Sequence, residues 1–185
     1  YELPVTYLDH VTAPFDEAPD LAVLMEIGAA TKEDAEIGAD GTVALEAQLE
    51  SILADAFEAE LVHDAVIARS AAQRANFWAM REGTLDAMQK HGKWVMNDIS
   101  FQVSDLPGAI ADMEAAFAAI APGPFCVAFG HMGDGNLHIN ARPYDKDPSE
   151  SPEEVKAIKD AVRDTVIKWR GSISAEHGIG TDKQR

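Results

Sequence analysis

Two histidines flank a glycine-rich turn in the second half of the chain. Apolar β-forming residues lead into Gly130-His131-Met132-Gly133-Asp134-Gly135-Asn136-Leu137-His138 and continue beyond it. An Asp-Gly pair between two such stretches favours a type I′ hairpin turn. Centred on Asp134 and Gly135, that turn would place His131 directly opposite His138, with Cβ atoms roughly 5 Å apart. Two imidazoles in that arrangement can bind one metal ion.

A third ligand is available near the end of the chain, where Glu176-His177 follows a predicted strand and precedes two glycines. Two histidines and a glutamate with an open fourth position are typical of a catalytic zinc site. Asn140, two residues after His138, should lie on the same face of its strand. The alternative for His131 and His138 is structural, with both rings hydrogen-bonded to backbone groups.

A single cation interrupts an apolar stripe on the helix predicted over residues 71–90. Trp78, Arg81, Leu85 and Met88 are spaced to share one face of that helix. A buried guanidinium requires a carboxylate partner. Arg81 therefore either forms a structural ion pair, with its aliphatic stem against the stripe, or binds the carboxylate of a substrate.

The elements that must position these residues predict an α+β fold. Residues 93–175 are predicted as β-α-β-β-α-β, the ferredoxin-like order, with an antiparallel sheet and helices on one face. Predicted strands cover residues 93–103, 125–132, 136–142 and 171–175. One helix begins near Asp105 and the other at Ser151-Pro152, and both have amphipathic spacing.

The first half of the chain is consistent with part of a second ferredoxin-like subdomain. Strands are predicted at residues 21–28 and 61–69, with a helix between them that Thr42 can cap. Residues 1–20 contain three prolines and are predicted to be an extended connector. Residues 21–185 are assigned to one domain that follows this connector.

Composition excludes several classes of partner. The net charge of −17 argues against nucleic acid and anionic membrane surfaces as partners. No apolar run approaches the roughly 18 residues that a membrane span needs. The only cysteine, Cys126, lies in an apolar stretch and is predicted to be a small buried core residue. The absence of a disulfide within these 185 residues is consistent with a cytoplasmic location.

The two motifs Gly130–His138 and Ser174-Ala175-Glu176-His177-Gly178-Ile179-Gly180 carry a resemblance. Together they resemble the paired signatures of the FAD-linked oxidase C-terminal domain, found in flavoproteins of the vanillyl-alcohol-oxidase type. That family includes D-lactate dehydrogenases, glycolate oxidase D subunits and D-2-hydroxyglutarate dehydrogenases. The segments Phe77-Trp78-x-x-Arg81-Glu82 and Asp98-Ile99-Ser100 also fit its pattern, so the resemblance covers most of residues 21–183.

The resemblance implies an FAD-dependent dehydrogenase that oxidises a D-2-hydroxyacid to a 2-oxoacid. Residues 21–185 would be its substrate- and metal-binding domain, truncated at the C-terminus. His131, His138 and Glu176 would bind a divalent metal, with zinc as the expected ion. That metal would lower the pKa of the C2 hydroxyl. His177 would take the hydroxyl proton, and the C2 hydride would pass to the flavin. Two more residues would bind the substrate: Arg81 its carboxylate and Asn140 as an assisting group.

Two departures from the family pattern bear on substrate and partners. Leu85 and Met96 stand where D-2-hydroxyglutarate dehydrogenases are expected to carry a hydroxylated residue and a lysine for a second carboxylate, although Thr84 is a partial substitute. An FAD-binding domain and the C-terminal flavin-contacting segment are missing, so we expect a fragment that is inactive alone. Its expected partners are the small 2-hydroxyacid, an N-terminal FAD-binding domain of the same protein and an unidentified electron acceptor. A homodimer is one option for its assembly. The alternatives are a zinc hydrolase and a metal-binding or assembly module without chemistry.

Overall fold

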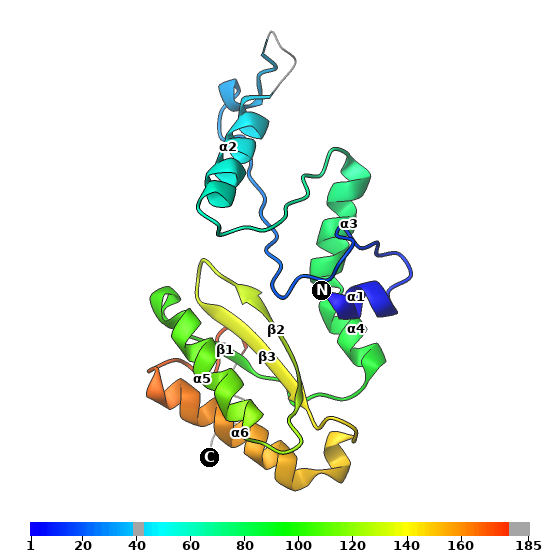
Figure 1. The fold of residues 1–185 in the computed structure, drawn as a ribbon, viewed down its shortest axis with the longest axis vertical. Helices are drawn as coiled ribbons and strands as arrows, with labels where there is room; N and C mark the ends of the chain where they lie inside the picture. Colours follow the sequence, from blue (N-terminus) through cyan, green and yellow to red (C-terminus); the bar gives the residue numbers. More distant parts are fainter. Residues whose placement is uncertain (39–42, 178–185) are drawn as a thin grey trace. The chain divides into compact units, whose positions relative to one another are not determined.

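A three-stranded antiparallel sheet forms the centre of the second of two units into which the chain divides, Tyr1–Ala87 (unit 1) and Met88–Arg185 (unit 2). The computed structural model (Figure 1) describes residues 1–38 and 43–177. The sheet consists of β1 (Asp98–Ser100), β2 (Phe125–His131) and β3 (Asn136–Arg142), in the order β1-β3-β2. Helices and an antiparallel sheet in one chain confirm the α+β class.

Two amphipathic helices, α5 (Leu106–Ala118) and α6 (Pro152–Lys168), supply most of the remaining core of unit 2. Each has a proline in its first turn, where the missing N–H has no intrahelical acceptor to lose. Neither N-cap residue, Asp105 or Ser151, makes the capping hydrogen bond that its side chain allows. The buried positions recur every four residues along both helices: Ala109, Met113, Phe117, Ile158, Val162 and Val166.

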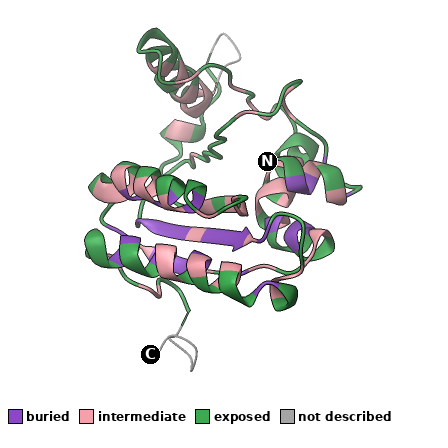
Figure 2. Cartoon of the chain, turned by 60° about the horizontal axis from the view of Figure 1, so that its bottom comes forward, coloured by how far each residue is buried: buried purple, intermediate pink, exposed green. Residues whose placement is uncertain are grey.

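The core of unit 2 lies between these helices and one face of the sheet. Figure 2 shows buried residues on the central strand and on the sides of the helices next to it. Ile99, Leu137, Ile139 and Ala141 project from the sheet into this core. Neighbouring strand residues point to opposite faces, so Asp98, His138 and Asn140 lie on the other face. The alternation thus separates the packing face from the face that carries the candidate site.

Two of the predicted strands, 93–103 and 171–175, are much shorter in the structure. Strand 93–103 is reduced to β1 and an isolated bridge at Val95, because the Asn97 side chain donates to the carbonyls of Val95 and Ile139 between them. The predicted strand 171–175 contributes one bridge, in which Ser172 and Ser100 exchange backbone hydrogen bonds of 3.0 and 2.8 Å. This bridge brings the segment that carries Glu176 to the free edge of β1.

Cys126 is exposed, so the prediction that it is a buried core residue is wrong. It lies on β2, which is an edge strand because the order is β1-β3-β2. Its position in the alternation is that of the core face, opposite Ala141 on β3. An edge strand can leave such a residue uncovered, which the apolar character of the stretch did not indicate.

Unit 1 is helical in its described part. Its helices are α1 (Glu2–Tyr7), α2 (Ala44–Glu58) and α3 (Ala71–Glu82), and α4 (Thr84–His91) runs across the boundary into unit 2. A short 3₁₀ helix covers Glu33–Ala35. The extended connector predicted for residues 1–20 instead begins with α1. The predicted cap Thr42 lies outside the described residues.

The strands predicted at residues 21–28 and 61–69 are not formed, so the described part of unit 1 contains no second sheet. Both segments are apolar but exposed, with Leu21 81% and Leu61 78% accessible. Side-chain contacts hold the first segment instead of strand pairing. Glu26 accepts hydrogen bonds of 2.6 Å from Arg74 and 2.7 Å from Trp78, both on α3. Apolar composition alone therefore misidentified an anchored loop as a strand.

The helix predicted over residues 71–90 is two helices, α3 and α4, separated at Gly83. The stripe that Arg81 was predicted to interrupt is therefore divided between them. Met88 is fully buried, whereas Trp78 and Leu85 are 37% and 39% accessible. Within residues 1–38 and 43–177, no helix combines the length and apolar character that a bilayer crossing requires.

Candidate functional site

The register of the β2–β3 hairpin differs from the prediction by two residues. His131 pairs with Asn136 and His138 pairs with Phe129, so the two histidines are diagonal neighbours rather than direct opposites. Both still lie on the same face, because paired residues and residues two apart share a face. The predicted direct opposition of His131 and His138 is therefore wrong, while their common face is retained.

The physical reason is the turn, which has four residues, Met132 to Gly135, instead of two. Type I′ requires positive φ at both central residues, and of Asp134 and Gly135 only Gly135 has it, at 75°. The Asp134 amide donates to the His131 carbonyl at 3.4 Å, and the Asp134 carboxylate accepts the Asn136 amide at 3.0 Å. A Cβ at Gly135 would lie 2.0 Å from the Phe101 carbonyl oxygen, so a side chain does not fit there.

Glu176 brings the two diagonal histidines into one cluster. Its Oε1 lies 3.7 Å from His131 Nε2, and its Oε2 lies 3.7 Å from His138 Nε2. The side chains of His131, Glu176 and His138 are 54%, 45% and 16% accessible, so the cluster opens to solvent on the His131 side. Three candidates from distant parts of the sequence therefore converge, and they do so through the two oxygens of Glu176.

Two imidazoles and a carboxylate are the donor types of a catalytic zinc site. Ligand atoms at roughly 2.0–2.2 Å from a tetrahedral zinc ion lie about 3.4 Å apart, close to the 3.7 Å that separates Glu176 from each imidazole. The approach is pairwise, however. In residues 1–38 and 43–177 no group of three or more His, Cys, Asp or Glu side chains is placed so that it could hold a metal ion.

Asp98 is the site residue that the sequence reasoning missed as a functional side chain. Its Oδ2 accepts three backbone N–H groups, from Ala175 at 3.3 Å and from Glu176 and His177 at 2.9 Å each. Its Oδ1 lies 3.7 Å from His138 Nδ1. Burial raises the pKa of Asp98, but the backbone donors and His138 outweigh burial and hold the pKa below its ordinary value. Only the β1–β3 register, which pairs Asp98 with His138, reveals this role.

His177 and Asn140 occupy different environments. His177 is exposed, and its ring centroid lies 6.4 Å from that of His138, which also stacks on Phe129 at 5.0 Å. Asn140 is 1% accessible. Its Oδ1 accepts the Asn97 amide at 3.2 Å, and its Nδ2 lies 3.9 Å from the Met88 sulfur. Asn140 therefore lies on the expected face but uses its amide within unit 2, and its role toward a substrate stays a prediction.

Arg81 lies in the last turn of α3 and is half-buried. It belongs to unit 1, whereas the histidines, Glu176 and Asp98 belong to unit 2. Its role as a carboxylate clamp therefore stays a prediction. Thr84, the partial substitute for a second-carboxylate group, is 8% accessible and donates to the Met80 carbonyl at 3.2 Å.

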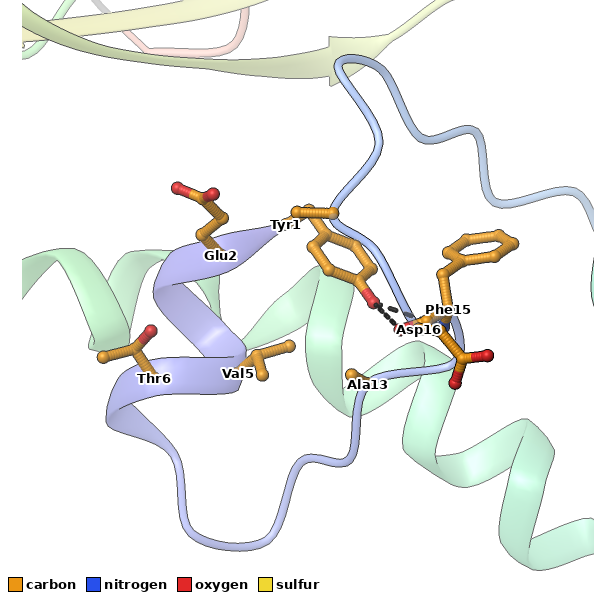
Figure 3. A pocket seen from close by; sticks show the side chains of 8 residues that line it. Tyr1, Glu2, Val5, Thr6, Ala13, Phe15 and Asp16 are labelled. Carbon is orange, nitrogen blue, oxygen red and sulfur yellow. Dashed lines mark hydrogen bonds between the residues drawn. The ribbon is translucent and has the colours of Figure 1, made fainter. Parts of the chain in front are cut away.

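Unit 1 also contains a pocket of about 300 Å³ between α1 and the segment that follows it. Figure 3 shows the Tyr1 hydroxyl in the pocket, where it donates to the Phe15 carbonyl and accepts the Phe15 amide, both at 3.2 Å. Glu2 and Asp16 are the charged groups of its lining. None of the predicted site residues lines this pocket.

The opposite end of the same sheet face carries a structural cluster around Arg142. Its Nη1 lies 3.2 Å from His91 Nδ1 and donates to the His91 carbonyl at 3.2 Å. The His91 ring stacks on Phe125 at 5.1 Å and approaches Trp94 at 5.4 Å. Burial and the nearby guanidinium of Arg142 lower the pKa of His91 below its ordinary value.

This lowered pKa predicts a pH dependence of stability. As pH falls through about 6.5, the ordinary pKa of histidine, the unfolded state binds a proton at position 91 before the folded state does. The free energy of unfolding should therefore fall between about pH 8 and about pH 5.5. Urea unfolding at both pH values should show a smaller decrease in His91→Gln than in wild type. His10→Gln, at an exposed position, should behave as wild type, and an equal decrease in all three proteins would contradict the prediction.

A family model and several curated proteins match most of this chain. The family described as "FAD linked oxidases, C-terminal domain" matches residues 18–185. A mitochondrial D-2-hydroxyglutarate dehydrogenase of Arabidopsis thaliana is 32% identical over 182 residues, covering 98% of this chain and 30% of that protein. A D-2-hydroxyglutarate dehydrogenase of Xanthomonas citri pv. viticola is 33% identical, covering 96% of this chain and 36% of its own length. A putative mitochondrial D-lactate dehydrogenase of Schizosaccharomyces pombe is 30% identical, and the match covers 92% of this chain and 32% of that protein. The chain thus spans about a third of the length of these relatives.

Proposed function

Because the chain belongs to the FAD linked oxidases, C-terminal domain family, we propose that it forms the substrate- and metal-binding part of a flavin-dependent D-2-hydroxyacid dehydrogenase. The observation that carries the proposal is the convergence of His131 and His138 on the Glu176 carboxylate. These residues come from the two motifs of the family, and they lie on the sheet face opposite α5 and α6.

We assign the metal to His131, His138 and Glu176, which offer two imidazole nitrogens and a carboxylate, the donor set of a catalytic zinc site. A divalent ion bound there would act as a Lewis acid on the substrate hydroxyl and lower its pKa. FAD, which we assign to another domain of the same protein, would supply the oxidant that accepts the C2 hydride. The residues of this chain bind and orient the substrate and move its hydroxyl proton.

His177 is the proposed general base. Its backbone N–H is held by Asp98 at 2.9 Å, and its neighbour Glu176 belongs to the proposed metal site. A base at this position reaches a hydroxyl bound beside the ligands and accepts its proton as the C–H bond at C2 breaks. The substrate loses one proton and one hydride, and the product is a 2-oxoacid. Arg81 would pair with the C1 carboxylate, and Asn140 would make a further polar contact.

The proposed substrate class is a small D-2-hydroxyacid with one carboxylate. The relatives are named for D-2-hydroxyglutarate and for D-lactate. In this chain Leu85 and Met96, at 39% and 56% accessible, stand where the family resemblance places groups for a second carboxylate. Apolar side chains leave a second carboxylate without a partner, which costs binding energy. Both positions favour the lactate-like class.

The test is a panel of D- and L-2-hydroxyacids against the intact protein, read anaerobically as loss of flavin absorbance. D-Lactate should reduce the flavin faster than D-2-hydroxyglutarate, and L-isomers should not reduce it. A metal chelator should lower the rate and added Zn²⁺ should restore it. Failure of every D-2-hydroxyacid would refute the proposal. Hydrolytic activity without flavin would instead support a zinc hydrolase, and metal uptake without either activity would support an assembly module.

The proposal also covers the location and the assembly of the protein. The relatives include proteins named as mitochondrial and proteins from bacteria. We propose a cytoplasmic location for this chain because its one cysteine, Cys126, forms no disulfide within it. We also propose that the protein forms a homodimer and passes electrons to an acceptor outside the chain. Size-exclusion chromatography of the intact protein tests whether it is a dimer.

A further inference from the structure

We propose that Asp98 is a positioning residue that sets the tautomer of His138 and fixes the backbone that presents Glu176 and His177. The inference rests on the proposed function for the identity of the bound ion, while the positioning itself is a property of the apo chain. Asp98 is 7% accessible and approaches both motifs, although it lies 40 residues before His138 and 79 residues before His177.

The first half of the role concerns the backbone from Ala175 to His177. Three consecutive N–H groups point at one oxygen, Oδ2 of Asp98, at 3.3, 2.9 and 2.9 Å. Consecutive amides of this kind form a concave anion-binding arrangement, and here the anion is a side chain of β1. Hydrogen bonds to a charged acceptor are roughly twice as strong as neutral ones. The Ser172–Ser100 bridge is the neighbouring attachment of this segment to the same strand.

The second half concerns the ring of His138. Its Nδ1 lies 3.7 Å from Asp98 Oδ1, and its Nε2 lies 3.7 Å from Glu176 Oε2. Asp98 Oδ1 is buried and has no hydrogen-bond partner among residues 1–38 and 43–177. A separation of 3.7 Å is longer than a hydrogen bond, and a shift of a few tenths of an ångström would form one. An unpartnered buried carboxylate oxygen is costly, so the favoured arrangement has the proton on Nδ1, directed at Asp98.

The tautomer has a chemical consequence. With the proton on Nδ1, the lone pair of Nε2 faces the Glu176 carboxylate, where the proposed metal would bind. A carboxylate that accepts the second N–H of a metal-ligating histidine fixes its tautomer and ring orientation, and mutating it typically costs 10–100-fold in metal affinity. Asp98 thereby connects the ligand His138 and the ligand Glu176 through one buried side chain.

The matched variants are Asp98→Asn and Asp145→Asn, the same chemical change at a buried and at an exposed position of unit 2. Asparagine at 98 keeps an oxygen for the three amides but can present an N–H group to Nδ1. His138 should then carry its proton on Nε2, the atom that faces Glu176. Nitrogen NMR of the metal-free chain with labelled histidine reports the tautomer at about pH 8, where imidazole is neutral.

Three results are expected. Wild type and Asp145→Asn should show the Nδ1–H tautomer at His138, and Asp98→Asn should show Nε2–H. Amides 175–177 should exchange with deuterium roughly tenfold faster in Asp98→Asn, because a neutral acceptor binds them less tightly. Zn²⁺ affinity, measured by competition with a chromophoric chelator, should fall about 10–100-fold in Asp98→Asn and stay unchanged in Asp145→Asn.

The outcomes separate the inference from the proposed function. An Nε2–H tautomer of His138 in wild type would overturn the inference. The inference would also fail if Asp98→Asn and Asp145→Asn showed the same His138 tautomer and the same exchange rates at amides 175–177. A wild-type chain that binds no Zn²⁺ counts against the proposed function, and the tautomer and exchange measurements then still decide the role of Asp98.

Discussion

Replacing His177 with glutamine should lower the rate of flavin reduction by a D-2-hydroxyacid about 10²–10⁴-fold in the intact protein, the usual effect of losing a general base. Glutamine has a polar side chain, but its amide is not a base and cannot accept the hydroxyl proton. The backbone hydrogen bond from residue 177 to Asp98 does not depend on the side chain, so the local structure should remain. KM should change little, because other residues are assigned to the substrate carboxylate and the metal.

The measurement is anaerobic rapid mixing of enzyme with substrate, followed by flavin absorbance. His63→Gln is the matched control, since His63 is an exposed histidine in unit 1 that no part of the proposed mechanism uses. It should retain the wild-type rate. Retention of a near wild-type rate in His177→Gln would remove His177 as the base. Loss of bound flavin or of metal in that variant would show a structural role instead.

Replacing Ile158 with alanine should lower the free energy of unfolding by about 2–5 kcal/mol. Ile158 lies in the middle of α6 and is fully buried in the core of unit 2. Its removal leaves a cavity between α6, α5 and the sheet that the surrounding side chains fill only in part. The same helix leads directly into Gly171, whose amide donates to the Val166 carbonyl at 2.9 Å, and so into the segment that carries Glu176.

Urea unfolding of wild type, Ile158→Ala and Ile167→Ala measures this effect. Ile167 lies on the same helix at 66% accessible, so its substitution makes the same chemical change without a cavity. The control should lie within about 0.5 kcal/mol of wild type. Equal stability of the two variants would show that the packing of α6 on the sheet contributes little to unit 2.

The amphipathic helices and the hairpin followed from the sequence because local signals agreed with long-range packing. Pro107 and Pro152 open α5 and α6, and apolar residues every three or four positions form their buried sides. The failures came where apolar residues are not buried. Residues 21–28 have the composition of a strand, but Glu26 is hydrogen-bonded to Arg74 and Trp78, and the segment pairs with no strand in the described part of the chain.

For the site, the sequence by itself determined the chemistry that is present. The two motifs with His131, His138, Glu176 and His177 carry the family and the donor set, because residue types and short spacings are local properties. The placement of His131 and His138 on one face of the sheet also followed, from the period of two along a strand.

Only the tertiary structure decided how those groups meet. The four-residue turn, with positive φ at Gly135 and not at Asp134, set the register that makes the histidines diagonal. The pairing of β1 with β3 placed Asp98 beside His138, and the bridge at Ser172 brought Glu176 between the two imidazoles. Hydrogen-bond register and strand order depend on the whole chain satisfying its backbone groups at once, and no local pattern in the sequence specifies them.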